Sequence, residues 1–443
     1  MLKQTTFFVL LLVCEVYNSK AQTGEPGKNF NEISQAKNEY YNRVGKDKPG
    51  YKQFKRWEWY YSTRTGPGGV LLDNQQMNLA ALRNSSANRS SLNAKTDANT
   101  GGWSIIGPTS VSSNNKGIGR INRIAFHPTN VNTLYVAGAT GGLWITTDGG
   151  ANWYSYSEGI PNMALSGVAV NYNNTAEIYI LTGDADDGKR SNGVLKTYDG
   201  GFTWYRTSLR WTLDNNAFAY KLLMHPTNPA LLMIPTSKGI FRTTNGGSTW
   251  DSTETGFHFY DMEFQPGNPS IVYACGRSSD SIIVMKSSNA GQTFTRTHAI
   301  RRLRNFDNEV SSNRSALAVT AANSSYVYLM TGPCTDAGEF QGFYRSTDIG
   351  ETFTLRTNTP NILGGSSTGD NADDQEGYDM AVVASPTNAN RVACGGIRLW
   401  TSTTGGTSFS FQDDYVSTLS YYHPDIHDLV YHPLDNTKLY MCG

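Results

Sequence analysis

The residues whose types and spacing could do chemistry in this chain lie first in two short acidic loops. One loop carries Asp184, Asp186 and Asp187, and the other carries Asp373 and Asp374. Calcium prefers closely spaced carboxylate oxygens, so each loop is a candidate calcium site. Neither loop follows the twelve-residue helix–loop–helix calcium pattern, and a solvated acidic surface loop is the alternative interpretation. No other metal and no organic cofactor is indicated.

A third candidate lies near the end of the chain, where His423, Asp425 and His427 alternate with other residues. Alternation along a strand would place these three side chains on one face. Imidazole and carboxylate groups gathered in this way could bind a metal ion or form an acid/base pair. The segment alone does not choose between these roles.

A repeated eight-residue segment must position these candidates. It begins at residues 146, 197, 243, 287, 346 and 402, with Asp or Asn third, Gly fifth and an aromatic residue eighth. These residues are Asp148, Gly150 and Trp153; Asp199, Gly201 and Trp204; Asn245, Gly247 and Trp250; Asn289, Gly291 and Phe294; Asp348, Gly350 and Phe353; and Gly406 and Phe409 in the sixth copy. Only the sixth copy departs at the third position, where Thr404 stands.

The three positions have separate physical roles in a tight turn. An Asp or Asn side chain can accept hydrogen bonds from backbone N–H groups of the turn. Gly permits a positive φ that other residues resist, and the aromatic residue begins the return strand with a large ring to bury. We therefore interpret the segments as structural hairpin corners and assign no catalytic residue.

A second recurring element precedes the repeated segments. Ile124–Asn130 leads to Leu134–Gly138, and Phe264–Pro269 leads in the same way to Val272–Gly276. Each repeat then reads as four strands in about 50 residues, which is typical of a propeller blade. The predicted fold class is all-β: a β-propeller of four-stranded blades over residues 103–443.

The propeller is expected to contain six complete blades and the start of a seventh. The last repeat reaches Leu439–Gly443 without its own eight-residue segment. We expect a sequence that is truncated at its C-terminus, and a ring left open with exposed sheet edges.

The first hundred residues differ from the repeats. Residues 1–21 read as a signal peptide, with Lys3, the apolar stretch Phe7–Val13 and small residues before a cleavage site at Ala21. Residues 22–73 form a helical, aromatic segment, in which Phe30, Ile33, Ala36, Tyr40 and Val44 would share one helix face. Tyr51–Tyr61 is expected to pack its rings on the main domain, and residues 74–102 form a polar linker.

The composition limits the possible partners. The chain of 443 residues has 37 Lys and Arg against 37 Asp and Glu, with 12% aromatic residues and 44 Gly. A neutral balance argues against an electrostatic grip on nucleic acid or on an anionic membrane. No apolar stretch is long enough to span a membrane. We expect a secreted or cell-surface protein.

The repeated segments resemble the Asp-box, or bacterial neuraminidase repeat, of sialidases, xyloglucanase-type glycoside hydrolases and sortilin-type receptors. Residues 103–443 most resemble the sortilin-like propellers of exported bacterial proteins, which are often labelled glycosyl hydrolase-like. The residues that carry this likeness are Gly119–Pro128, Thr182–Asp184, Tyr378–Ala381 and His423–His427. The resemblance implies export by the type IX pathway.

Enzymes that carry this repeat depend on particular catalytic and binding residues. A sialidase needs converging arginines, and the spacing of Arg120, Arg123 and the other candidates does not predict convergence. A xyloglucanase-type enzyme uses two carboxylates that flank the scissile bond. The resemblance implies that the first of these acids lies where this chain has Ala139.

The leading hypothesis is an exported, non-catalytic β-propeller that binds a protein, peptide or glycan through its loops or central funnel. Fold and function separate readily in propellers, because ligands bind to the loops. The alternative is an Asp-box glycoside hydrolase, xyloglucanase-like or less readily sialidase-like, that acts on an extracellular polysaccharide. For the leading hypothesis we expect no nucleic-acid partner.

Overall fold

The computed structural model describes residues 29–46, 48, 50–62, 65–71, 119–157, 160, 163–301, 314–332, 340–371, 375–412 and 424–443. The chain divides into two compact units, residues 1–84 and 85–443. The predicted signal peptide and the predicted linker lie outside the described residues. In the described part of the chain, no helix is long and apolar enough to cross a membrane.

The first unit contains a helical hairpin of α1 (Phe30–Val44) and α2 (Tyr51–Ser62), followed by a short 3-10 turn, η1 (Pro67–Gly69). The Asn29 side chain caps α1 by accepting from two backbone N–H groups of its first turn. The rings of α2 pack on α1, since Phe54 stacks on Tyr41 at 5.7 Å between ring centroids. The predicted helix face is therefore rotated: Tyr41 is buried, whereas Tyr40 is 46% exposed.

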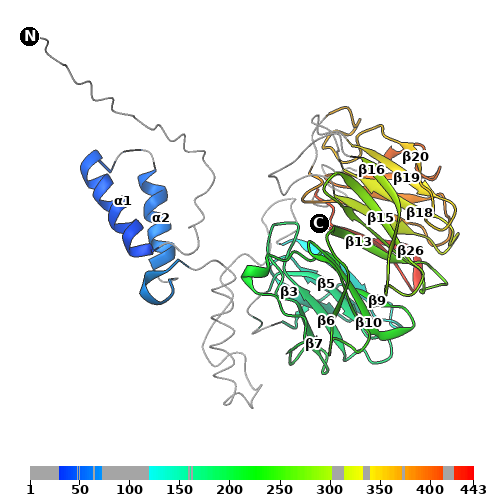
Figure 1. The fold of residues 1–443 in the computed structure, drawn as a ribbon, viewed down its shortest axis with the longest axis horizontal. Coiled ribbons are helices and arrows are strands. Elements are labelled where there is room, and N and C mark those ends of the chain that lie inside the picture. Colours follow the sequence, from blue (N-terminus) through cyan, green and yellow to red (C-terminus); the bar gives the residue numbers. More distant parts are fainter. Residues whose placement is uncertain are drawn as a thin grey trace, which may run out of the picture. The chain divides into compact units, whose positions relative to one another are not determined.

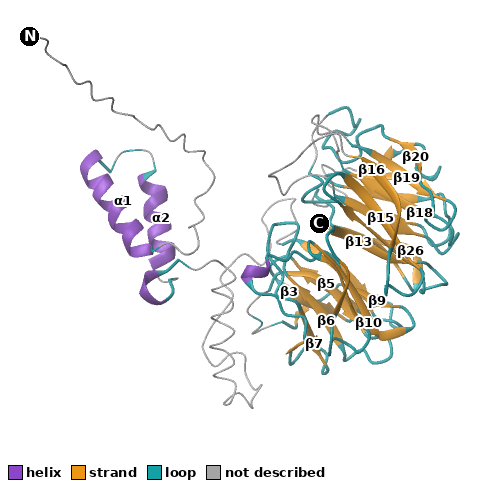
Figure 2. Cartoon of the chain, viewed as in Figure 1, coloured by secondary structure: helices purple, strands orange, loops and turns teal. Residues whose placement is uncertain are grey.

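In its described residues, the second unit is a β-propeller of six four-stranded antiparallel sheets, each ordered as its strands follow in sequence, and one two-stranded sheet (Figures 1 and 2). The first three blades are β1 (Ile121–Phe126), β2 (Leu134–Gly138), β3 (Gly142–Thr146) and β4 (Tyr154–Ser155); β5 (Leu165–Val170), β6 (Ile178–Thr182), β7 (Val194–Thr197) and β8 (Tyr205–Arg206); and β9 (Leu223–His225), β10 (Asn228–Thr236), β11 (Gly239–Thr243) and β12 (Asp251–Glu254). A 3-10 turn, η3 (Leu213–Asn215), precedes β9.

The remaining sheets complete the unit. They are β13 (His258–Phe264), β14 (Val272–Arg277), β15 (Ser281–Ser287) and β16 (Thr295–Arg301); β17 (Ser315–Val319), β18 (Val327–Thr331), β19 (Gly342–Ser346) and β20 (Thr354–Thr357); β21 (Ala381–Ala384), β22 (Val392–Gly395), β23 (Leu399–Ser402) and β24 (Ser410–Phe411); and the two-stranded sheet β25 (Asp428–His432) and β26 (Asp435–Cys442).

Burial along each blade explains the runs of apolar residues in the sequence. The second strands β2, β6 and β18 are buried at every residue, because neighbouring blades cover both of their faces. The outer strand β8 is exposed at both of its residues. A chain that alternates between these two environments produces the repeated pattern of apolar strand, turn and polar strand.

The repeated segments form the turns between the third and fourth strands. In the second copy, Asp199 Oδ1 accepts from Thr203 N at 2.8 Å and from Thr197 Oγ1 at 2.7 Å. In the sixth copy, Thr404 Oγ1 accepts from Ser408 N at 3.1 Å, so a hydroxyl takes the place of the carboxylate. Of the six aromatic residues at the eighth position, only Trp204 and Phe353 are buried, and the other four are half-buried.

In five of the six segments, the glycine at the fifth position also lies close to the preceding blade. A Cβ on Gly406 would lie 2.3 Å from Cδ1 of Phe343 in the fifth blade, and one on Gly350 would lie 2.6 Å from Tyr273 in the fourth. Gly150 differs, since its Cβ would meet only Trp153 of its own turn, at 3.8 Å. Positive φ and close packing between blades therefore both require glycine at position 406.

We expect Gly406→Ala to destabilise the propeller more than Gly150→Ala. Both changes place a side chain at positive φ, 86° and 96° respectively, which costs about 1–2 kcal/mol. Only Gly406→Ala also drives a methyl group into a fully buried Phe343 ring, which adds about 1–3 kcal/mol. Urea unfolding of the two variants measures this difference. Equal losses would show that the blades do not meet as closely at Gly406.

The two-stranded sheet packs on both of its neighbours, which differs from the open ring expected from the sequence. On one side, Leu429 and Ile426 are buried against Ala381 and Ala393 of the sixth blade. On the other side, the N–H of Ile124 in β1 donates to Asp428 Oδ2 at 3.2 Å, and Ile121 N donates to the carbonyl of Gly443 at 3.3 Å. Apolar packing and hydrogen bonding thus place β25 between β21 and β1.

Candidate functional site

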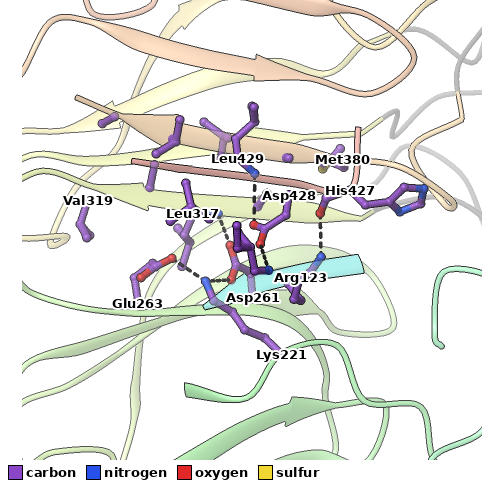
Figure 3. A pocket seen from close by; sticks show the side chains of 18 of the residues that line it. Arg123, Lys221, Asp261, Glu263, Leu317, Val319, Met380, His427, Asp428 and Leu429 are labelled. Atoms are coloured by element: carbon purple, nitrogen blue, oxygen red, sulfur yellow. Dashed lines mark hydrogen bonds and ion pairs between the residues drawn. The ribbon is translucent and has the colours of Figure 1, made fainter. Parts of the chain in front are cut away.

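The first strands of six sheets and the residues just before β9 line a central cavity of about 390 Å³. Figure 3 shows part of its lining. Its lining comes from β1, β5, the residues just before β9, β13, β17, β21 and β25. Small and apolar residues form part of the wall, and charged side chains stand among them. This arrangement creates a channel whose polar groups come from segments up to 300 residues apart in sequence.

A lysine ion pair lies within the channel. Lys221 Nζ lies 2.9 Å from Asp261 Oδ1 and 2.5 Å from Glu263 Oε1 (Figure 3). Burial disfavours the charged ammonium, but the two carboxylates outweigh it and raise the pKa of Lys221 above its usual value. Asp261 Oδ2 also accepts from the N–H of Leu317, so this group joins β9, β13 and β17.

An arginine joins three of the segments around the channel. Arg123 donates from Nη1 to the carbonyl of His427 at 2.6 Å and from Nη2 to the carbonyl of Tyr220 at 3.1 Å. Beside it, burial raises the pKa of Asp428 even though Arg123 opposes that shift. The first blade is thereby tied both to the two-stranded sheet and to the third blade.

One rim of the channel gathers the N-terminal ends of these inner strands. Asp184, which follows β6, is fully buried and forms an ion pair with Arg120 and another with Lys189 at 3.3 Å. Asn122 donates to Asp184 Oδ1 at 3.1 Å. Burial raises the pKa of Asp184, and the two cations oppose that shift. The carboxylate predicted to bind calcium is therefore already satisfied by basic groups.

The neighbouring Asp186 is held in the same way. Its Oδ1 lies 2.8 Å from Arg314 Nη1, and its Oδ2 lies 2.9 Å from His427 Nδ1. Burial opposes ionisation of Asp186, but Arg314 and His427 hold its pKa below the usual value. Burial lowers the pKa of His427, so its ring is neutral at pH 7 and donates from Nδ1, which leaves Nε2 as an acceptor. His427 Nε2 has no hydrogen-bond partner within the described residues.

A protonated carboxyl completes the rim. Asp379 is fully buried just before β21, and burial together with the neighbouring carboxyl of Asp425 raises its pKa to about 8. At neutral pH this group is mostly a neutral acid. The Tyr378 ring lies between two members of the rim, since it meets His427 edge-on at 4.9 Å and lies 4.8 Å from the Arg120 guanidinium carbon.

We expect Asp379→Asn to remove part of the pH dependence of stability. The carboxyl pKa is about 8 when folded and 3.8 ordinarily, so its stabilisation is complete below pH 4 and is lost as the pH rises towards 8. Between these two pH values the folded state binds about one more proton than the unfolded state. The free energy of unfolding therefore falls by about 1.4 kcal/mol per pH unit. Denaturant unfolding at pH 5, 6 and 7 should show wild type losing stability relative to the variant. Parallel pH profiles would contradict the protonated state.

The structure brings together some of the site residues predicted from the sequence and separates others. Asp184, Asp186, Asp425 and His427 meet at the rim, whereas Asp187 is 57% exposed and pairs with Lys189. Asp373, Asp374 and His423 lie outside the described residues. In the described part of the chain, no group of three or more His, Cys, Asp and Glu side chains is arranged to hold a metal ion.

Three residues at the site were not singled out from the sequence. Arg314, Lys221 and Asp379 stand at the starts of inner strands, but only Asp379 lies in a segment that carried the resemblance. Arg120, Arg123 and Arg314 do approach one rim, although their spacing did not predict that three arginines converge. The signal that could have found them is their common position, just before or within the first strand of a repeat.

Comparisons with known proteins point to the same fold. Over 132 residues, the chain is 28% identical to a probable oligoxyloglucan-reducing end-specific xyloglucanase of Neosartorya fischeri. The matched stretch covers 27% of this chain and 15% of that protein. A GH74 enzyme of Niastella koreensis aligns with a TM-score of 0.52 and 17% identity over 74% of this chain and 51% of the other. The GH74 xyloglucanase of Xanthomonas campestris aligns with a TM-score of 0.52 and 15% identity, over 73% and 50%.

These matches cover only part of each relative. The chain spans about half the length of the two solved structures and 15% of the curated xyloglucanase. No family model matches the chain. At these identities, the likeness to the solved structures shows the β-propeller fold.

Proposed function

We propose that this chain is an exported, non-catalytic propeller of the Asp-box type that binds an extracellular protein, peptide or glycan at the rim of its channel. The observation that carries the proposal is the convergence of four distant segments at this rim. They contribute Arg120, Asp184, Asp379 and His427, and each segment also carries the resemblance to exported sortilin-like propellers.

The pairing of the rim charges supports binding over catalysis. Asp184 is neutralised by Arg120 and Lys189, and Asp186 by Arg314, so neither stands free as a nucleophile or base. These ion pairs are buried, so they act by holding the half-buried Tyr378 ring in place beside His427, and a rim that is ordered in this way favours recognition by shape and hydrogen bonding. Ala139, at the position of the first xyloglucanase-type acid, is buried and has no proton to give.

The test presents the full chain to a glycan array and to a displayed random-peptide library. The variants are Tyr378→Ala and Asp425→Asn at the rim, with Glu351→Gln, which is 59% exposed on the fifth blade, as the control. We expect at least one probe to bind wild type and the control, and to bind the rim variants about tenfold more weakly. Equal binding by all four proteins, or turnover of a bound polysaccharide, would overturn the proposal.

A glycoside hydrolase is the second candidate, and the protonation of Asp379 favours it. A general acid must carry its proton at working pH, and burial beside Asp425 keeps Asp379 protonated. The partial match to a probable xyloglucanase points to xyloglucan as the first substrate to try. Release of reducing ends from xyloglucan, lost in Asp379→Asn, would establish this function in place of simple binding.

A further inference from the structure

The outer edge of the second blade carries three exposed aromatic side chains. Tyr198, Phe202 and Tyr205 are 57%, 57% and 55% exposed. They occupy the second and sixth positions of the repeated segment that begins at Thr197, and the ninth position, just after it. Single exposed apolar side chains are normal on a protein surface, whereas a cluster of them marks an interaction site.

The other five repeats show that the fold does not need these rings. At the second position they carry Thr147, Thr244, Ser288, Thr347 and Thr403. At the sixth position they carry Ala151, Ser248, Gln292, Glu351 and Thr407. At the ninth position they carry Tyr154, Asp251, Thr295, Thr354 and Ser410. All six segments make the same turn, so small and polar side chains suffice at the second and sixth positions, and at the ninth position only Tyr154 of the first repeat is also aromatic.

The rings are held in place by their surroundings. The Tyr198 and Tyr205 centroids lie 5.9 Å apart, and Phe202 meets Tyr156 of the first blade at 5.7 Å. Lys196 Nζ lies 4.5 Å from the Tyr198 centroid, and its ion pair with Glu177, at 2.8 Å, fixes it there. A surface that is ordered before its ligand arrives loses little entropy on binding.

We propose that Tyr198, Phe202 and Tyr205 form an aromatic platform that binds a neutral polysaccharide, separate from the channel rim. The C–H face of a sugar ring stacks on an aromatic ring, and the hydroxyls at its edge remain in water. Among the described residues of the first two blades, every large exposed apolar side chain is aromatic, the others being Trp144 and Tyr154. Aromatic side chains are also common at protein interfaces, so the charges around the rings decide between the classes of ligand.

Charge also favours a neutral ligand. The Lys196 ammonium is matched by Glu177, and the Asp199 carboxylate is engaged by the hydroxyl and N–H of Thr203. Arg206 follows Tyr205 on β8 and therefore lies on the opposite face of the strand. A polyanion would therefore meet Lys196 already paired with Glu177.

The test is affinity electrophoresis of the full chain in gels that contain hydroxyethyl cellulose or xyloglucan. The variant Tyr198→Thr/Phe202→Ser/Tyr205→Thr uses residues that other repeats carry at these positions, so its turn should fold. We expect wild type to be retarded by at least one glucan, with up to about tenfold loss of affinity for each ring removed. Leu355→Thr, which removes a side chain 51% exposed on the fifth blade, should behave as wild type.

Three outcomes would overturn the platform. They are migration of wild type unaffected by either glucan, equal retardation of wild type and the triple variant, and a shift from oligomer to monomer in the triple variant on size exclusion, which would make the rings a contact between copies. The rim variant Tyr378→Ala separates the two proposals. Retained glucan binding in that variant supports a separate platform, whereas its loss there would assign the glucan to the rim.

Discussion

Arg314→Met should destabilise the propeller by about 3–5 kcal/mol, the range for breaking a buried ion pair. Arg314 is 4% exposed and its partner Asp186 is 6% exposed, so the variant leaves a carboxylate buried beside a neutral His427. Arg314 also donates to the carbonyl of Tyr378 at 3.2 Å, a contact that ties the fifth blade to the sixth. Denaturant unfolding at pH 7 measures the loss.

The double variant Asp186→Asn/Arg314→Met tests whether the loss comes from the unpaired charge. Removing both charges should restore much of the stability, because the cost lies in the carboxylate left without its partner. A second check uses pH. Burial, and to a smaller degree Arg314, lower the pKa of His427, so acidification below its ordinary value of 6.5 destabilises the folded state; removing Arg314 should make the loss of stability between pH 8 and pH 6 smaller than in wild type. A single variant as stable as wild type would contradict the pairing.

Lys221→Met should cost about 3 kcal/mol, the lower end of the range for a buried pair, because the cavity leaves the lysine side chain 23% exposed. Without the ammonium, the Asp261 and Glu263 carboxylates, two residues apart on β13, are left side by side with no cation between them. Burial already raises the pKa of Glu263, and the loss of Lys221 should raise it further. A raised folded pKa stabilises the protein at low pH, so the variant should recover stability between pH 7 and pH 5.

The matched control for this prediction is Lys286→Met. Lys286 Nζ lies 2.5 Å from Glu351 Oε1, but Glu351 is 59% exposed, and a surface pair of this kind contributes about 0–1 kcal/mol. Urea unfolding of the two lysine variants at pH 7 gives the comparison. Similar losses for Lys221→Met and Lys286→Met would mean that the channel solvates its charges as well as the surface does.

The rim and the aromatic platform are two kinds of surface on one scaffold. The rim is built from charges that satisfy each other, such as Asp186 with Arg314, and is shaped by the segments that line the channel. The platform lies on one turn of the second blade, with Phe202 packed on Tyr156 of the first blade. A change that unfolds the ring should therefore abolish rim recognition, whereas Tyr198→Thr should act on the platform alone.

The sequence by itself determined the class of fold. The eight-residue segment and the strands around it depend on local properties, namely the φ that Gly406 must adopt, the hydrogen bonds of Asp199, and alternating burial along each strand. Local properties repeat whenever the segment repeats, so six copies predict six four-stranded sheets. The likeness to GH74 structures agrees with that prediction at the level of the propeller fold.

Only the tertiary structure decided which charges meet. Asp184 and Asp186 share a loop that suggests calcium, yet Arg120 and Arg314 come from other blades to neutralise them. The buried face of α1 likewise depends on α2, because Phe54 of α2 packs on Tyr41 and Tyr40 stays exposed. Closing a ring brings the first strands of all the repeats to one axis, and partners that are 60 to 300 residues apart leave no periodic trace in the sequence. Such contacts depend on the whole ring, so no single segment encodes them.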